Sequence, residues 1–174
     1  TELVASPEEA DLIIVNTCAF IEPARKEAID TILELSDYDA KLVVCGCLPQ
    51  RYKDEIVKLL PEVDRFITID EYSNIAKIVG DVVNSSFKIN NEFSPLNRIN
   101  TEPSYMRYVK ISEGCLNRCA FCAIPLIRGK LHSRTIENIV EEVKNIVAEG
   151  VYEINLISQD TTKYGYDLYK RLAL

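Results

Sequence analysis

Short apolar runs alternate with amphipathic segments along the first half of the chain. The apolar runs are continuous and bounded by polar residues, as is typical of buried parallel strands, and they cover residues 10–17, 41–46 and 65–69. The amphipathic segments have apolar positions at helical spacing, and they cover residues 22–36, 49–60 and 71–83. Pro23 marks the start of the first helix, Pro61 stops the second, and Asp70 is placed to cap the third. Strand and helix alternating in this way predict a small α/β domain with a parallel sheet.

The second half opens with a segment that has no periodicity. Residues 85–104 are rich in Asn, Ser and Pro, which indicates a linker between domains. Residues 105–112 then alternate like a strand, residues 134–150 form an amphipathic helix with Gly150 as its stop, and residues 152–160 form another strand. This order predicts the first part of a partial β/α barrel, in which active groups lie on loops at the carboxyl ends of strands.

These patterns divide the chain into three parts. We expect an N-terminal domain over residues 1–84, a linker over 85–104, and the first part of a barrel domain over 105–174. A complete barrel needs roughly 200 residues or more, and the chain begins with Thr1 rather than Met. We therefore expect a truncated barrel, and a piece of a longer protein that lacks the start of its first domain.

The charge is uneven between the two halves. The net charge is −7, with 17 acidic and 8 basic residues over positions 1–84 against 8 acidic and 10 basic residues over positions 105–174. The acidic half argues against broad binding of nucleic acid there and is compatible with a basic partner or with an ordinary solvated surface. No apolar run is long enough for a membrane span and no signal peptide is apparent, so we expect a cytoplasmic protein without a membrane partner.

Cysteine is the residue type that carries chemistry here. The six cysteines are Cys18, Cys45, Cys47, Cys115, Cys119 and Cys122. The last three form C-x3-C-x2-C, which is too tight for ordinary structural disulfides and favours metal binding in a reducing compartment.

Three thiolates on one short loop are one fewer than a closed zinc or [4Fe–4S] site requires. They can hold three irons of a [4Fe–4S] cluster and leave the fourth iron open to a chelating ligand such as S-adenosylmethionine. Phe121 directly precedes the last of these cysteines and is placed to lie against the adenine ring of that cofactor. The alternative is a structural zinc site in which His132 supplies the fourth ligand.

Longer phrases around the cysteines carry a family resemblance. The phrases are "VNTCAFIEPARKEAID", "CGCLPQRY", "KISEGCLNRCAFCAIPLIRGK" and "NLISQDTTKYGYDLY". Together they resemble the methylthiotransferases of the radical S-adenosylmethionine superfamily, and are most similar to the members that modify an aspartate of a small-subunit ribosomal protein. The tRNA-modifying members typically show a different phrase in place of "SQDTTKYGYDLY".

The resemblance implies a second [4Fe–4S] cluster in the N-terminal domain. Cys18 and Cys47 match two of its three cysteine ligands, and each ends a predicted strand, so both are expected at one edge of the sheet. The third family cysteine lies in a "GC-x-K-N" phrase upstream of Thr1. Cys45 is interpreted as a buried thiol that behaves as a small hydrophobic residue.

The resemblance also implies a mechanism and partners. An electron from a donor such as flavodoxin or ferredoxin cleaves S-adenosylmethionine, and the deoxyadenosyl radical abstracts hydrogen from the β-carbon of the aspartate. The second cluster then delivers the methylthio group. Gln159 is placed to hydrogen-bond the bound cofactor, or else only to cap its loop, and no side chain is singled out as a catalytic acid or base.

Two rival functions remain open from the sequence. One keeps the chemistry and changes the substrate to an adenosine of tRNA, with nucleic-acid contact only through a C-terminal part that this chain lacks. The other is a non-catalytic module that binds an iron–sulfur cluster or zinc.

Overall fold

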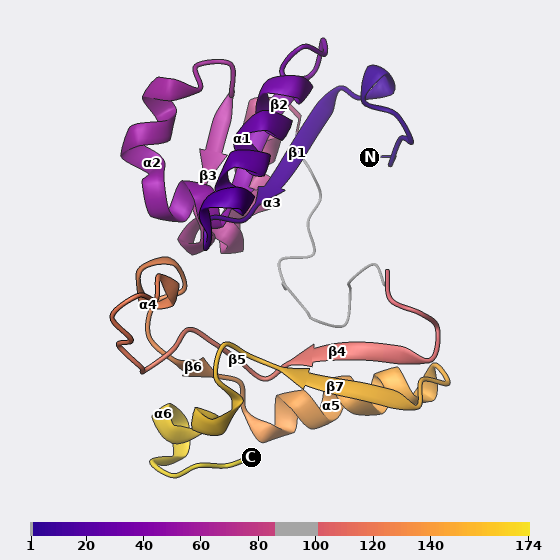
Figure 1. Ribbon diagram of the computed structural model, residues 1–174. Helices are drawn as coiled ribbons and strands as arrows, with labels where there is room; N and C mark the ends of the chain where they lie inside the picture. The colour runs from indigo at the N-terminus through magenta and orange to yellow at the C-terminus, as the bar shows by residue number, and fades with distance from the viewer. Residues whose placement is uncertain (1, 86–100) are drawn as a thin grey trace. The chain divides into compact units, whose positions relative to one another are not determined.

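The computed structural model describes residues 2–85 and 101–174 (Figure 1). Backbone contacts divide the chain into two compact units, Thr1–Asn91 and Glu92–Leu174. Most of the predicted linker, residues 86–100, lies outside the described residues.

The first unit is built on a three-stranded parallel sheet of order β1–β2–β3. Its strands are β1 (Leu12–Thr17), β2 (Lys41–Gly46) and β3 (Arg65–Ile67). Its helices are α1 (Glu22–Leu35), α2 (Cys47–Leu59) and α3 (Ile75–Val82), with short 3-10 turns η1 (Pro7–Glu9) and η2 (Ile69–Asn74). The predicted α/β fold with a small parallel sheet is therefore confirmed.

Side chains of the central strand alternate between the two faces of this sheet. Val43 and Cys45 of β2 join Ile67 of β3 in a core cluster with Val79 of α3. Cys45 is buried, as predicted for a thiol that packs like a hydrophobic residue, and this burial raises the pKa of its thiol. Leu42 of β2 is also buried and points to the opposite face, so the strand is covered on both sides.

Two helix starts differ from the sequence prediction. Helix α2 begins at Cys47 rather than at residue 49, and it is kinked at Tyr52, whose backbone leaves the helical region. The helix predicted over residues 71–83 is divided into the 3-10 turn η2 and helix α3, which begins only at Ile75. The 3-10 turn is capped by Thr68 rather than by Asp70, because Thr68 forms a reciprocal capping box with Glu71. Hydrogen bonds from Thr68 hold the pKa of Glu71 down at about 2.

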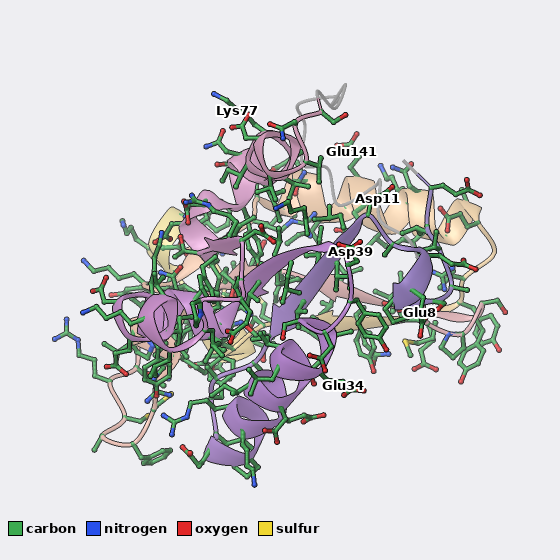
Figure 2. All side chains as sticks on the ribbon, turned by 90° about the horizontal axis from the view of Figure 1, so that it is seen from above. Glu8, Asp11, Glu34, Asp39, Lys77 and Glu141 are labelled. Atoms are coloured by element: carbon green, nitrogen blue, oxygen red, sulfur yellow. The ribbon has the colours of Figure 1, made fainter. Side chains whose placement is uncertain are left out.

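Several acidic side chains lie near the end of this sheet at which strands β1 and β2 begin (Figure 2). Asp11 directly precedes β1, Asp39 lies in the turn before β2, and Glu34 lies in the last turn of α1. Leu12 pairs with Lys41, so the starts of β1 and β2 are neighbours. These three carboxylates thus lie at the end of the sheet opposite to the one that carries the predicted cysteine ligands.

The second unit consists of a parallel strand pair with a helix packed on one face. Strands β4 (Met106–Lys110) and β7 (Glu153–Ile157) are parallel neighbours, and Figure 1 shows α5 (Ile136–Ala148) running alongside them. The short strands β5 (Ser112–Glu113) and β6 (His132–Ser133) pair antiparallel. The remaining elements are α4 (Ile124–Ile127), η4 (Thr161–Lys163) and α6 (Tyr166–Tyr169). A strand–helix–strand unit was predicted, but the predicted strand over residues 105–112 is split into β4 and β5.

The core of the second unit lies between the strand pair and α5. Val109 and Ile111 pack with Ile139 and Ile146 of α5. The helix ends before Gly150, which has a φ of 88°, and this confirms the predicted stop. No helix within residues 2–85 and 101–174 is long and apolar enough to cross a membrane.

Candidate functional site

The three-cysteine loop leaves the sheet directly after β5 and returns to it at β6. Its base is closed by the backbone, since the Cys115 N–H donates to the Gly129 carbonyl oxygen over 3.2 Å. Gly114 has a φ of 74°, and a Cβ there would stand 2.2 Å from the Lys130 carbonyl oxygen. Only glycine therefore permits this close approach of the two ends of the loop.

Within the loop the cysteines keep free thiols and differ in exposure. Cys119 is exposed, whereas Cys115 and Cys122 are partly buried. The Asn117 N–H donates to Cys115 Sγ over 3.4 Å, and the Cys122 N–H donates to the Cys119 carbonyl oxygen over 3.0 Å. Across the described ranges, no three Cys, His, Asp or Glu side chains are gathered as a metal site. The structure thus places the three cysteines on one loop without bringing their sulfur atoms together.

The donor set of this loop is suited to iron–sulfur chemistry. Thiolates are the usual protein ligands of such clusters, and backbone N–H groups that donate to sulfur are one means by which proteins tune them. The exposed Cys119 and partly buried Cys115 and Cys122 have free thiols available for coordination. His132, the candidate ligand of the zinc alternative, lies on β6 with an exposed side chain.

A side-chain network links the start of the loop to the end of β7. Gln159 Nε2 donates to Glu113 Oε1 over 2.8 Å, and Glu113 Oε2 lies 2.6 Å from Lys110 Nζ and 3.6 Å from Arg128 Nη1. The buried Gln159 Oε1 has no hydrogen-bond partner among the described residues, and neither has the buried Ser158 Oγ. Buried polar atoms are normally satisfied, so these two at the carboxyl end of β7 are candidates for contact with an ordered water or a ligand. Gln159 is therefore both a structural and a candidate ligand-binding residue.

A second contact joins the loop to the segment after β7. Asn117 Nδ2 donates to Asp160 Oδ2 over 2.7 Å, and Asp160 Oδ1 accepts from the N–H and the hydroxyl of Thr162. Hydrogen bonds from Thr162 and Asn117 hold the pKa of Asp160 below its usual value.

Phe121 is the most exposed large hydrophobic side chain of the loop. It is 94% exposed, and Leu126 of α4 nearby in sequence is 73% exposed. An aromatic ring left in solvent is available to lie against a flat apolar group of a ligand. The position assigned to Phe121 from the sequence is compatible with this geometry.

In the first unit, both candidate cysteines follow neighbouring strands. Thr17 pairs with Gly46 in the register of β1 and β2, and each is followed directly by a candidate ligand, Cys18 and Cys47. Cys18 is exposed, while Cys47 is buried as the first residue of α2. The carboxyl ends of two parallel strands thus carry these cysteines to the same edge of the sheet.

Two further side chains fix the backbone around these cysteines. The Thr17 hydroxyl donates to the Cys45 carbonyl oxygen over 2.7 Å and accepts from the Leu48 N–H over 3.3 Å. Arg51 Nη1 donates to the Ala19 carbonyl oxygen over 2.8 Å. Thr17 therefore ties β1 to the start of α2, and Arg51 ties α2 to the segment after Cys18.

Sequence reasoning missed several residues that shape the second unit. Glu113 and Asn117 lie inside the quoted motif, but their partners are far away along the chain. Asp167 Oδ2 accepts from the Ser133 N–H, and the Tyr164 hydroxyl donates to the Arg134 carbonyl oxygen, so part of the "SQDTTKYGYDLY" phrase anchors itself on β6. The sequence offered one indication of these contacts, the acidic Glu113 beside the cysteine motif, but it did not indicate which residue Glu113 would contact.

Comparison with protein families finds a match in each unit. The model of the uncharacterized protein family UPF0004 matches residues 1–68, and the model of the radical SAM superfamily matches residues 109–174.

Curated relatives match along nearly the whole chain. A ribosomal protein uS12 methylthiotransferase RimO from Bdellovibrio bacteriovorus is 48% identical over 98% of this chain and 40% of its own length. Proteins of the same name from Clostridium botulinum and Geotalea uraniireducens are each 46% identical, over 99% and 96% of this chain and 41% and 40% of their own lengths. The chain thus spans about two fifths of the curated relatives that it matches.

A solved structure shares the fold. The radical S-adenosylmethionine methyltransferase TsrM from Kitasatospora setae, solved with tryptophan and an aza analogue of S-adenosylmethionine, aligns with a TM-score of 0.54. The alignment covers 88% of this chain and 37% of that one at 13% sequence identity. At this identity the likeness shows the fold alone.

Proposed function

Because the chain belongs to the methylthiotransferase family of radical S-adenosylmethionine enzymes, we propose that the whole protein transfers a methylthio group to ribosomal protein uS12. The relatives named for this reaction match both units of the chain at nearly half identity. The observation that carries the proposal is the C-x3-C-x2-C loop, which stands at the carboxyl end of a parallel strand pair.

In this proposal Cys115, Cys119 and Cys122 hold three irons of a [4Fe–4S] cluster. When bound, such a cluster would supply a coordination site for S-adenosylmethionine and the electron for its reductive cleavage. The chain's own residues bind and orient the cofactor. Gln159 offers its unpartnered Oε1 to a donor on the cofactor, and the exposed Phe121 ring packs against the adenine.

Cys18 and Cys47 are proposed as ligands of a second [4Fe–4S] cluster. They follow paired positions of β1 and β2, which supports a shared site at that edge. A cysteine outside this chain is expected to supply the third ligand. Buried Cys45, whose thiol packs in the sheet core, is not assigned to this site.

The finer features of the reaction are also proposals. The acceptor is the β-carbon of an aspartate of uS12, the electron comes from a flavodoxin or a ferredoxin, and the enzyme works in the cytoplasm. The residues present serve to orient the cofactors and exclude water around them, while the cofactors supply the difficult chemistry.

The test uses the full-length protein, reconstituted without oxygen and supplied with uS12 or with tRNA. We expect the methylthio mass on a uS12 aspartate, and formation of deoxyadenosine on reduction. Replacing Cys115, Cys119 and Cys122 together by alanine should remove about four irons and abolish deoxyadenosine formation. Cys45→Ala is the matched control, because it removes a cysteine that lies in the core, and it should keep the iron content of the parent.

Two results would contradict the proposal. Binding of zinc without iron by the parent would favour the non-catalytic module. Methylthio mass on tRNA adenosine and none on uS12 would favour the rival substrate.

A further inference from the structure

The three-cysteine loop and the segment after β7 meet through one short side-chain hydrogen bond. Asn117 lies between Cys115 and Cys119, and its Nδ2 donates to Asp160 Oδ2 over 2.7 Å. The acceptor is a carboxylate, so the bond is charge-assisted and stronger than one between neutral groups. A loop that carries two partly buried cysteines and one exposed cysteine is thereby tied to the segment that follows β7.

The other oxygen of the same carboxylate fixes Asp160 itself. Asp160 Oδ1 accepts from the Thr162 N–H over 3.1 Å and from the Thr162 hydroxyl over 2.6 Å, so that Asp160 caps η4. The two oxygens therefore have separate tasks, one toward η4 and one toward the cysteine loop. Asp160 reaches Asn117 from a preset position, which reduces the entropy lost when the contact forms.

The same asparagine contacts a cysteine through its backbone. The Asn117 N–H donates to Cys115 Sγ over 3.4 Å. Hydrogen bonds to ligand sulfur stabilise the more negatively charged, reduced form of an iron–sulfur cluster and raise its reduction potential. Holding the Asn117 side chain therefore also holds the N–H group that faces the sulfur.

We propose that Asp160 is a positioning residue for the cysteine loop, which it holds through Asn117 so that Cys115 keeps its hydrogen bond and the loop retains its cluster. This inference rests on the proposed function, since it assumes a cluster on Cys115, Cys119 and Cys122. It adds a contact from the segment after β7 that shapes the cluster site without touching the reacting atoms.

The chain offers a matched pair of variants that separates the two tasks of Asp160. Asn117→Ala removes the contact to Oδ2 and leaves the η4 cap intact. Thr162→Val removes a hydroxyl from Oδ1 and leaves the contact to Asn117 intact. A swap, Asn117→Asp with Asp160→Asn, restores a donor and an acceptor across the same gap, whereas Asn117→Asp alone sets two carboxylates against each other.

Three measurements on the full-length protein report on the order of the cysteine loop and on its cluster. The first is hydrogen exchange of peptides covering residues 115–122 before reconstitution. The second is the rate of iron loss to a chelator after anaerobic reconstitution, and the third is the midpoint potential of the cluster from EPR. For Asn117→Ala we expect about five- to tenfold faster exchange and iron loss, with a more negative potential. Thr162→Val should lose far less than Asn117→Ala, because the N–H of residue 162 still donates to Asp160 Oδ1, and the swap should recover most of the loss that Asn117→Asp causes.

The outcomes distinguish this inference from the proposed function. A parent that loads its cluster while Asn117→Ala and Thr162→Val release iron at the parental rate would overturn the inference alone. A parent that binds no iron at these three cysteines would overturn both. Equal losses in Asn117→Ala and Thr162→Val would also overturn it, because the effect would then belong to the η4 cap.

Discussion

Replacing Gly114 by alanine should open the base of the cysteine loop. The added Cβ would stand 2.2 Å from the Lys130 carbonyl oxygen and 2.8 Å from that of Gly129, so the returning strand must retreat by about 1 Å to reach ordinary contact. Such a retreat would break the 3.2 Å hydrogen bond between the Cys115 N–H and the Gly129 carbonyl oxygen, at a cost of about 1 kcal/mol. A non-glycine residue at a φ of 74° costs a further 1 kcal/mol or so. The sum is about 2–3 kcal/mol with the displacement of neighbouring backbone included.

Gly129→Ala is the control for this prediction. Gly129 has a φ of 72°, nearly that of Gly114, but a Cβ there would meet no atom within 4 Å. It should therefore cost only the conformational part, about 1 kcal/mol. The assay is hydrogen exchange of peptides covering residues 111–133 in the full-length protein, together with iron bound per chain after anaerobic reconstitution. The difference of about 1–2 kcal/mol predicts about 5- to 30-fold faster exchange, and lower iron retention, in Gly114→Ala than in Gly129→Ala. Equal effects of the two substitutions would refute the argument from close approach.

Three further substitutions test the packing around the two sites. Glu71→Gln should lower the free energy of unfolding by about 1–2 kcal/mol at pH 7, a figure discounted for partial exposure, and by almost nothing near pH 2. Because the folded pKa of about 2 lies below the unfolded one, the stabilisation is present above about pH 4.5 and is lost as the pH falls toward 2. Urea unfolding followed by hydrogen exchange in the first unit measures this loss, with the exposed Glu62→Gln as control. Thr17→Val should cost about 1–3 kcal/mol in the same assay, because it removes a buried hydroxyl that bridges β2 and α2; a loss below 0.5 kcal/mol would contradict this role. Glu142→Ala should destabilise the second unit by about 3 kcal/mol, because the side chain of Glu142 is 4% exposed and lies 2.6 Å from Arg134. Thermal unfolding followed by circular dichroism measures this loss, and an unchanged melting temperature would contradict the prediction.

The parallel strands could be read from the sequence because burial on both faces leaves an uninterrupted apolar run. Strand β2 was predicted with both of its bounds correct, since Lys41 and Gly46 punctuate the run "LVVC". The start of α2 was predicted two residues too late, because proline favours the first turn of a helix and the prediction began the helix at Pro49. The helix instead begins at Cys47, directly after Gly46, whose φ is 101°. The Thr68 cap was available in the sequence as a Thr-x-x-Glu capping box, and the acidic Asp70 inside it was chosen instead.

The contacts that shape the candidate site could not be read in this way. Asn117 and Asp160 are 43 residues apart, and Glu113 and Gln159 are 46 residues apart. Local periodicity predicts which edge of a sheet a residue reaches, so the cysteines and Gln159 were placed correctly at the carboxyl ends of strands. Which side chains meet at that edge depends on loop conformation, and loop conformation is set by long-range packing rather than by neighbouring residues.

In both units the candidate ligand cysteines follow the carboxyl ends of strands, and this leaves the opposite ends of the strands free of any predicted ligand. The turn through Asp39 before β2 and the exposed turn at Glu149 and Gly150 before β7 lie at those opposite ends, whereas Val151 directly after it is buried in the core. Surface turns of this kind tolerate added length at a low entropic cost. Epitopes or fluorophore attachment sites can therefore be placed there, away from every candidate ligand cysteine, whereas an insertion in the turns after β1 and β5 would change the spacing of Cys18 and Cys115 from their strands.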